Sequence, residues 1–267
     1  MTFKKILRTF ATIARPILLP GVIYFNRFIR GLAKFSHKTQ FYLQWAVKPN
    51  PEWFDHYLDQ YYKWHTSRNP LGWERGIFNL LALKPESTVL ELCCGDGFNA
   101  HHFYSIRVKN ILSIDFDPKA IAHAKQNFQA DNVVYQCHDI RQGLPKGPFT
   151  NVIWDAAIEH FTIDEITRIL NEVKQRIGKT GILSGYTIVE RDDGASHDDH
   201  EYEFKSKEDL QLLLKSFFKH VVVLETVFPD RTNLYFYTSE SPISFLDDFQ
   251  LPVKKITSQQ QEEAMIV

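Results

Sequence analysis

The stretch that decides the fold is Thr88-Val89-Leu90-Glu91-Leu92-Cys93-Cys94-Gly95-Asp96-Gly97, followed further along by Ile111-Leu112-Ser113-Ile114-Asp115. It predicts a buried strand running into a Gly-x-Gly turn, then a helix, then a second apolar strand ending in a carboxylate. Glycines let the backbone approach a ligand closely, because no Cβ stands in the way. Asp115 comes twenty residues after Gly95, where a carboxylate can accept hydrogen bonds from ribose hydroxyls. The stretch therefore predicts the nucleotide-binding half of a doubly wound α/β fold.

The charges around the turn indicate which nucleotide is bound. A dinucleotide would place its anionic diphosphate on this turn, at the N-terminus of the following helix. Here Glu91 lies in the strand and Asp96 in the turn itself, and two carboxylates would repel a diphosphate at close range. S-adenosylmethionine instead carries a cationic sulfonium and a cationic ammonium group. The acidic turn therefore favours S-adenosylmethionine and disfavours an NAD(P)-dependent oxidoreductase.

At this point the sequence resembles a known family. The stretch from Glu91 to Gly97 is similar to motif I of the class I S-adenosylmethionine-dependent methyltransferases, written acidic-x-Gly-x-Gly-x-Gly, with Cys93 where the family usually has its first glycine. The resemblance covers about residues 70–240. It implies a three-layer α/β sandwich with a seven-stranded, mostly parallel sheet in the order 3-2-1-4-5-7-6. Two expected strands, 220–227 and 233–238, would form its C-terminal antiparallel hairpin.

The resemblance also implies which residues bind the cofactor. Glu91 and the turn would hold the methionine end, Asp115 the ribose, and Asp139, after the third expected strand, the adenine amino group. Arg75 is a candidate to face the cofactor's carboxylate, and a salt bridge with nearby acids is the alternative. The full set assigned to the cofactor is Glu91, Cys93, Gly95, Gly97, Asp115, Phe116, Asp139, Ile140 and Arg75.

Histidines in two loops are the catalytic candidates. His160 follows the fourth expected strand, and Glu159-His160 resembles the Glu-His pair found at this point in many small-molecule methyltransferases of this family. His197 and His200 lie in the polar loop after the fifth expected strand. A histidine can act as a general base because its pKa lies near neutrality. His160 can equally be a packed helix-start residue, and the loop histidines can be merely solvated. His197, His200 and Glu203 could also ligate a metal, by analogy with methyltransferases that bind a catechol-like substrate on a divalent ion, but the pattern is weak and we expect no metal.

Composition limits the compartment and the partners. Three cysteines show neither a disulfide framework nor zinc spacing, which favours a reducing, cytoplasmic setting. Nine of the 31 basic residues lie in residues 1–50, which contain no acid, so the rest carries 22 basic against 32 acidic residues. An acidic body argues against a nucleic-acid substrate. So does the absence, after the fourth strand, of the Asn/Asp-Pro-Pro-Tyr motif that in this family holds a flipped base.

The chain divides into four expected parts. Residues 1–38 form a basic amphipathic helical extension, 39–84 an aromatic-rich helical lid, 85–240 the methyltransferase domain, and 241–267 a flexible tail. The extension has three interpretations: a helix on an anionic membrane surface, a helix packed on the domain or covering the active site, or an organelle-targeting segment. Its apolar run is too short to span a bilayer.

The sequence thus predicts a methyltransferase that uses S-adenosylmethionine to methylate an oxygen or nitrogen of a small molecule, including a lipid-linked or glycan acceptor. The alternative is a non-catalytic methyltransferase-like module that docks on a membrane or a protein. The oligomeric state cannot be read from the sequence.

Overall fold

The computed structural model of the 267-residue chain describes residues 3–47, 71–191, 199–228 and 231–243. It separates into two compact units, residues 1–48 and 49–267. Half of the predicted lid, residues 48–70, and nearly all of the predicted tail lie outside the described residues.

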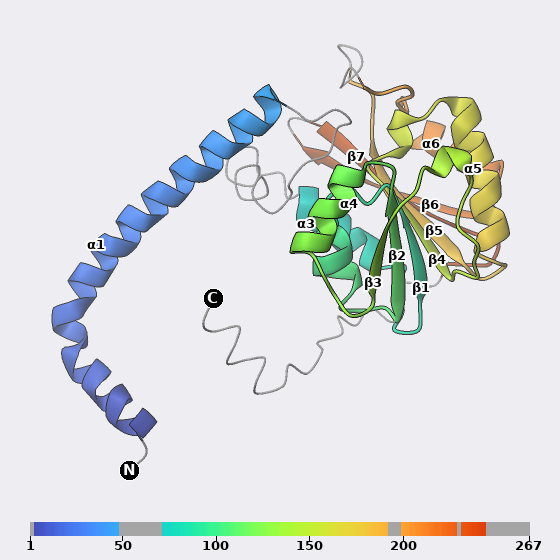
Figure 1. The fold of residues 1–267 in the computed structure, drawn as a ribbon. Coiled ribbons are helices and arrows are strands. Elements are labelled where there is room, and N and C mark those ends of the chain that lie inside the picture. The colour runs from blue at the N-terminus through green and yellow to red at the C-terminus, as the bar shows by residue number, and fades with distance from the viewer. Residues whose placement is uncertain (1–2, 48–70, 192–198, 229–230, 244–267) are drawn as a thin grey trace. The chain divides into compact units, whose positions relative to one another are not determined.

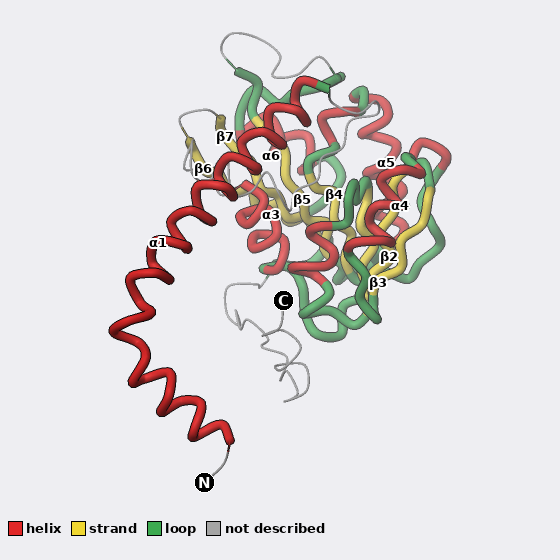
Figure 2. Tube along the Cα trace, turned by 60° about the vertical axis from the view of Figure 1, so that its left-hand side comes forward, coloured by secondary structure: helices red, strands yellow, loops and turns green. Residues whose placement is uncertain are grey.

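The first unit is the helix α1, Phe3–Ala46. It continues past the boundary expected at residue 38, because no proline or glycine follows Gly31 before Pro49. It also runs through Pro16 and Pro20, and its axis bends in the N-terminal part that holds these prolines (Figure 2), as expected where a helical hydrogen bond is missing. In the described part of the chain, no helix has both the length and the apolar character needed to cross a bilayer.

The second unit is built on one seven-stranded sheet in the order β3-β2-β1-β4-β5-β7-β6, which confirms the predicted topology (Figure 1). The first five strands are parallel, and β7 is antiparallel to both its neighbours. The strands are β1 Thr88–Leu92, β2 Asn110–Asp115, β3 Val133–Cys137, β4 Asn151–Asp155, β5 Ile182–Ile188, β6 His220–Phe228 and β7 Arg231–Ser239.

Helices cover both faces of the sheet. On one face, α3 (Leu71–Leu80), the short π-helix η1 (Ala100–Tyr104) and α4 (Pro118–Asn127) share an apolar cluster with β1 and β2. On the other, α5 (Ile163–Arg176) and α6 (Lys207–Lys215) share a larger cluster with β4, β5 and β7. The central strands are buried on both faces, as parallel sheets require. Two 3₁₀ turns, η2 (Ile140–Gln142) and η3 (Ile158–His160), follow β3 and β4.

Three of the described α-helices, α4, α5 and α6, begin at residues whose side chains cap them. Asp117 caps α4 with Pro118 in its first turn, Thr162 and Glu165 form a capping box at α5, and the Ser206 side chain accepts the Asp209 N–H at the start of α6. Each cap satisfies N–H groups that the helix itself leaves without partners.

Candidate active site

The site lies where the strand order reverses. β1 pairs with β2 on one side and β4 on the other, and Leu92 is in register with both Ile114 and Trp154. The turn Cys93–Gly97 therefore leaves β1 between the ends of its two neighbours, Asp115 on β2 and Asp155 on β4. Open α/β sheets bind ligands at this crevice, beyond the carboxyl ends of the strands.

The turn itself has an unusual backbone. Cys93, Gly95 and Gly97 have φ angles of 55°, 55° and 81°, in the region that favours glycine. A Cβ on Gly97 would meet the Tyr135 ring at 2.8 Å, whereas a Cβ on Gly95 would meet nothing within 4 Å. Gly97 is thus needed for packing, and the space over Gly95 is open for a ligand. The Gly95 N–H donates to Asp115 Oδ2 at 2.9 Å and ties the turn to β2.

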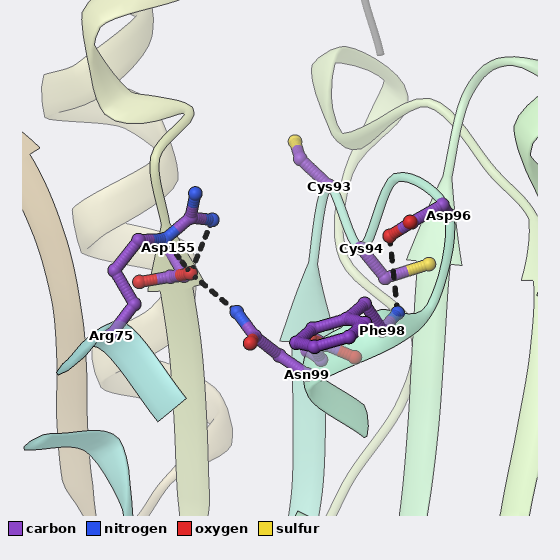
Figure 3. Close-up of a pocket in the computed structure, with 8 residues that line it drawn as sticks. Arg75, Cys93, Cys94, Asp96, Phe98, Asn99 and Asp155 are labelled. Atoms are coloured by element: carbon purple, nitrogen blue, oxygen red, sulfur yellow. Dashed lines mark hydrogen bonds and ion pairs between the residues drawn. The ribbon is translucent and has the colours of Figure 1, made fainter. Parts of the chain in front are cut away.

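Beside the turn is a pocket lined by acids (Figure 3). About 250 Å³ of space, part of it open solvent, lies within this pocket. Three of its carboxylates belong to Glu91, Asp96 and Asp155, which are 3%, 1% and 5% exposed. The whole lining is Arg75, Glu91, Cys93, Cys94, Asp96, Phe98, Asn99 and Asp155. Buried carboxylates require positive partners, so the pocket suits a ligand with cationic groups.

Arg75 on α3 supplies one cation. Its Nε and Nη2 lie 2.7 and 2.5 Å from Asp155 Oδ2, and Asn99 donates to the same oxygen at 3.0 Å (Figure 3). Asn79 donates to Asp155 Oδ1 at 3.2 Å. Burial alone would lower the pKa of Arg75, but the Asp155 carboxylate outweighs it and raises the pKa. The salt-bridge alternative for Arg75 is therefore present, inside the pocket lining.

Glu91 differs from the other two acids. Its Oε2 accepts a hydrogen bond from Ser113 Oγ at 2.6 Å. Burial nevertheless raises the pKa of Glu91 to about 8, the Ser113 hydrogen bond opposes the rise, and the charges of Asp155 and Asp96 add to it. A cation placed in the pocket would reverse this effect by stabilising the charged form. Glu91 can therefore respond to the charge of a bound ligand.

The candidate ribose and adenine residues lie next to the turn. Asp115 is 8% exposed and accepts backbone N–H groups from Gly95 and Asp117, both at 2.9 Å. Asp139 caps η2 by accepting the Arg141 N–H at 2.9 Å, which is the turn role that such a residue often has. Ile140 is buried and Phe116 is 47% exposed, so Phe116 is open to contact a ligand.

Two of the three candidate histidines come together. His160 ends η3, and its ring centroid lies 4.9 Å from that of His200, although forty residues separate them. The third, His197, lies outside the described residues. The sequence reasoning overlooked Asp155 and Asn99, although an acid ending the fourth strand repeats the Asp115 pattern and could have indicated Asp155.

The fold and this acidic site define a domain of the class I S-adenosylmethionine-dependent methyltransferase type. Residues 89–181 match the family model described as a methyltransferase domain. The cofactor of the class is S-adenosylmethionine. The residues present fit it, because three buried carboxylates line the pocket beside the turn and can face the ligand's cationic groups, and because the backbone at Gly95 is open to close approach.

The chain is similar in sequence to one characterised methyltransferase and in fold to two solved structures. The ribosomal protein L11 methyltransferase of Aquifex aeolicus is 28% identical over 103 residues, which are 39% of this chain and 40% of that protein. DhpI in complex with SAH superposes with a TM-score of 0.52 at 17% identity, over 64% of this chain and 86% of DhpI. The N-methyltransferase NodS of Bradyrhizobium japonicum gives 0.52 at 18% identity, over 64% and 97% of the two chains. The two structures share the fold, and the chain spans less than half of the curated relative.

Proposed function

We propose that this protein transfers the methyl group of S-adenosylmethionine to an oxygen or nitrogen of a small molecule. The observation that carries the proposal is the pocket at the switch point that Glu91, Asp96 and Asp155 line, next to a turn whose backbone is open at Gly95. The acidic body supports a small acceptor over nucleic acid. Lipid-linked and glycan acceptors remain within this class.

The chain's residues would act mainly by holding the reactants. Glu91 and the turn from Cys93 to Gly97 would bind the methionine end, and Arg75, while paired with Asp155, would face its carboxylate. Asp115 would accept the ribose hydroxyls, and Asp139 the adenine amino group, with Phe116 and Ile140 beside the ring. The bound cofactor supplies a methyl group that is already activated. Proximity and alignment then account for much of the acceleration.

An acceptor hydroxyl would also need a base. His160 and His200 are the described candidates, and His197 is the third, three residues before His200 in the sequence. The His160 Nδ1 lies 3.0 Å from the backbone oxygen of Asp199, which orients the ring and leaves Nε2 as the basic nitrogen. An amine acceptor that arrives neutral would need no such base.

Calorimetric titration of the full-length protein with S-adenosylhomocysteine, with NAD as the control, tests the proposal. Micromolar binding of the first and none of the second is expected, because the carboxylates repel a diphosphate. Acceptors are then screened with labelled methyl donor. Binding of NAD instead would indicate an oxidoreductase. Well-folded protein that binds neither compound would favour a non-catalytic docking module.

We further propose that α1 contacts an anionic membrane surface from the cytoplasmic side. Along the helix, Arg27, Arg30, Lys34 and Lys38 recur on one face, at spacings that align in an α-helix. The opposite face carries the exposed apolar side chains Leu18, Val22, Phe25, Ile29 and Leu32. Such helices lie in the headgroup region of a bilayer. The three cysteines are all free thiols, which supports the reducing compartment.

Co-sedimentation with vesicles tests the membrane proposal. Vesicles containing anionic phosphatidylglycerol should bind the protein, and replacing the four basic residues of that face by Gln should weaken binding roughly 100-fold or more, since each contributes about 1 kcal/mol. A matched control replaces four exposed lysines of the other unit, Lys109, Lys119, Lys125 and Lys146. Equal losses in both variants, or no binding by the unaltered protein, would count against a specific role of α1. Packing of α1 on the domain and organelle targeting would then be the interpretations left.

A further inference from the structure

A second group of potential ligands lies beyond the carboxyl end of β4. Glu159 and His160 come from η3, and His200 comes from the segment that leads to α6. One ligand atom from each residue lies within 4.8 Å of the other two. We propose that these three side chains bind a divalent transition-metal ion.

The hydrogen bonds of the two histidines support this assignment. His160 Nδ1 lies 3.0 Å from the Asp199 backbone oxygen, an acceptor, and His200 Nδ1 contacts the Glu203 carboxylate. An Nδ1–H that donates to an oxygen leaves the lone pair on Nε2, which is the tautomer that binds a metal. Metal-binding histidines commonly have such a carbonyl or carboxylate partner. Both rings therefore have the supporting contacts of metal ligands.

Glu159 supplies an oxygen ligand that is otherwise not neutralised. It is 4% exposed, and within the described ranges no lysine or arginine forms an ion pair with it. Its Oε2 accepts a hydrogen bond from Thr187 Oγ1 at 3.1 Å. A buried carboxylate is costly without a positive partner, and a metal ion between Glu159 and the two imidazoles would provide one.

The backbone holds the three ligands in place. The Glu159 carbonyl accepts N–H groups from Glu201 at 2.9 Å and Tyr202 at 3.2 Å, which fixes the residues next to His200 over η3. Phe204 is fully buried and its carbonyl accepts the Glu190 N–H at 2.9 Å. Tetrahedral metal bonds of about 2.1 Å place neighbouring ligand atoms about 3.4 Å apart, so the side chains would move towards one another by up to about 1.4 Å to close the site around an ion.

The donor set indicates which ion. Two imidazole nitrogens and one carboxylate suit Zn²⁺, Fe²⁺ or Mn²⁺, whereas Mg²⁺ and Ca²⁺ prefer all-oxygen sites. Three protein ligands leave coordination positions open. If the proposed methyl transfer holds, an oxygen of the acceptor is the natural ligand for an open position, so the acceptor would be a hydroxyl compound, and His160 and His200 would hold the ion instead of acting as the base. This last step rests on the proposed function, but the metal site does not.

The test uses tag-free, full-length protein stripped with EDTA. Calorimetry should detect one Zn²⁺ per chain, with weaker Mn²⁺ binding and no measurable Mg²⁺ binding. His160→Gln and His200→Gln should each weaken Zn²⁺ binding at least 100-fold, while His220→Gln, a histidine on the edge strand β6, should change nothing. Glu203→Gln should weaken binding 10–100-fold by releasing the His200 ring. Co²⁺ in place of Zn²⁺ gives a visible absorption spectrum that reports nitrogen ligation.

Some outcomes would overturn the proposal. Folded protein without stoichiometric Zn²⁺ binding would do so, as would ligand variants that bind like His220→Gln. The contact between His200 and Glu203 would then be a local side-chain interaction, and His160 and His200 would remain candidate bases. Titration of the same samples with S-adenosylhomocysteine separates the two proposals: cofactor binding without Zn²⁺ binding refutes the metal site alone, and Zn²⁺ binding without cofactor binding refutes the proposed function alone.

Discussion

The guanidinium of Arg75 and the carboxylate of Asp155 form an ion pair, 2.5 Å between Nη2 and Oδ2, that joins α3 to the end of β4. Both side chains are largely buried, at 12% and 4% exposure. Asn79 and Asn99 also donate hydrogen bonds to Asp155. Three side chains, two from α3 and one from the segment before η1, therefore meet at the Asp155 carboxylate. The helix before the first strand is thereby fixed to the wall of the pocket.

Asp155→Asn should therefore destabilise the domain. The substitution leaves the buried Arg75 charge without its counterion, and breaking such a pair on one side costs roughly 3–5 kcal/mol. Urea unfolding followed by far-UV circular dichroism measures the change. Asp131→Asn, at an exposed loop position, is the matched control. Its free energy of unfolding should stay within about 0.5 kcal/mol of that of the unaltered protein. A loss at Asp155 no larger than this control would show that the pair contributes little.

Asp115→Ala should weaken cofactor binding in a folded domain. Hydrogen bonds to a charged acceptor contribute about 1.5–3 kcal/mol, so affinity for S-adenosylhomocysteine should fall roughly 10–100-fold. Because Asp115 also accepts the Gly95 and Asp117 N–H groups, thermal unfolding must be measured on the same variant. Unchanged affinity would remove Asp115 from the cofactor site, and a large loss of stability would assign it to the turn instead.

Binding of S-adenosylmethionine should release a proton from Glu91. Without ligand the pKa of Glu91 is about 8, raised chiefly by burial. At pH 7 the Glu91 carboxyl is therefore protonated in most molecules. A cationic ligand favours the charged form and lowers the pKa, so affinity should rise with pH up to about 8, by at most tenfold per unit, and level off above it.

Calorimetry at pH 7 in buffers with different ionisation enthalpies counts the protons released. Close to one proton is expected for the unaltered protein, and none for Glu91→Gln. Because S-adenosylhomocysteine lacks the sulfonium charge, it should release a smaller fraction. Equal release from the unaltered protein and the Gln variant would place the titrating group elsewhere.

The sequence predicted the fold because its signals are local. The apolar strands and the final hairpin are each signalled by residues that lie close together in the sequence. The strand order itself was implied by the family resemblance. The exception is the helix expected after Gly97. Its regular part is the five-residue π-helix η1, in which the Ser105 N–H bonds to the Ala100 oxygen at 2.8 Å. No residue pattern signals that wider winding.

The site was less accessible because its contacts are long-range. Arg75 and Asp155 are eighty residues apart, and His160 and His200 are forty apart. Their meeting depends on how α3 and the loop after β5 return to the sheet, which no spacing in the sequence encodes. The position of the β1 turn could be predicted because the glycine spacing fixes the turn itself, and the role of its residues in cofactor binding stays a prediction.

Cys93→Gly tests why a cysteine occupies a glycine position. Cys93 has a φ of 55°, and a non-glycine residue in this region costs about 1 kcal/mol or more. Glycine removes that strain but also gives the unfolded chain more freedom, which costs about 0.4–1 kcal/mol. The two effects oppose each other, so the free energy of unfolding should change by less than about 1 kcal/mol. Cys93→Val, whose branched Cβ cannot adopt this φ without strain, should lose more than that.

Cofactor affinity separates a steric role of Cys93 from a chemical one. Burial raises the pKa of the Cys93 thiol well above its usual value, and Asp115 raises it further, so the side chain is uncharged at pH 7 and its removal deletes no charge. Removing the Cβ and sulfur lets the ligand lie closer to the backbone. Titration with S-adenosylhomocysteine should therefore give equal or tighter binding in Cys93→Gly. A tenfold loss, with unfolding unchanged, would mean that the sulfur itself contacts the cofactor.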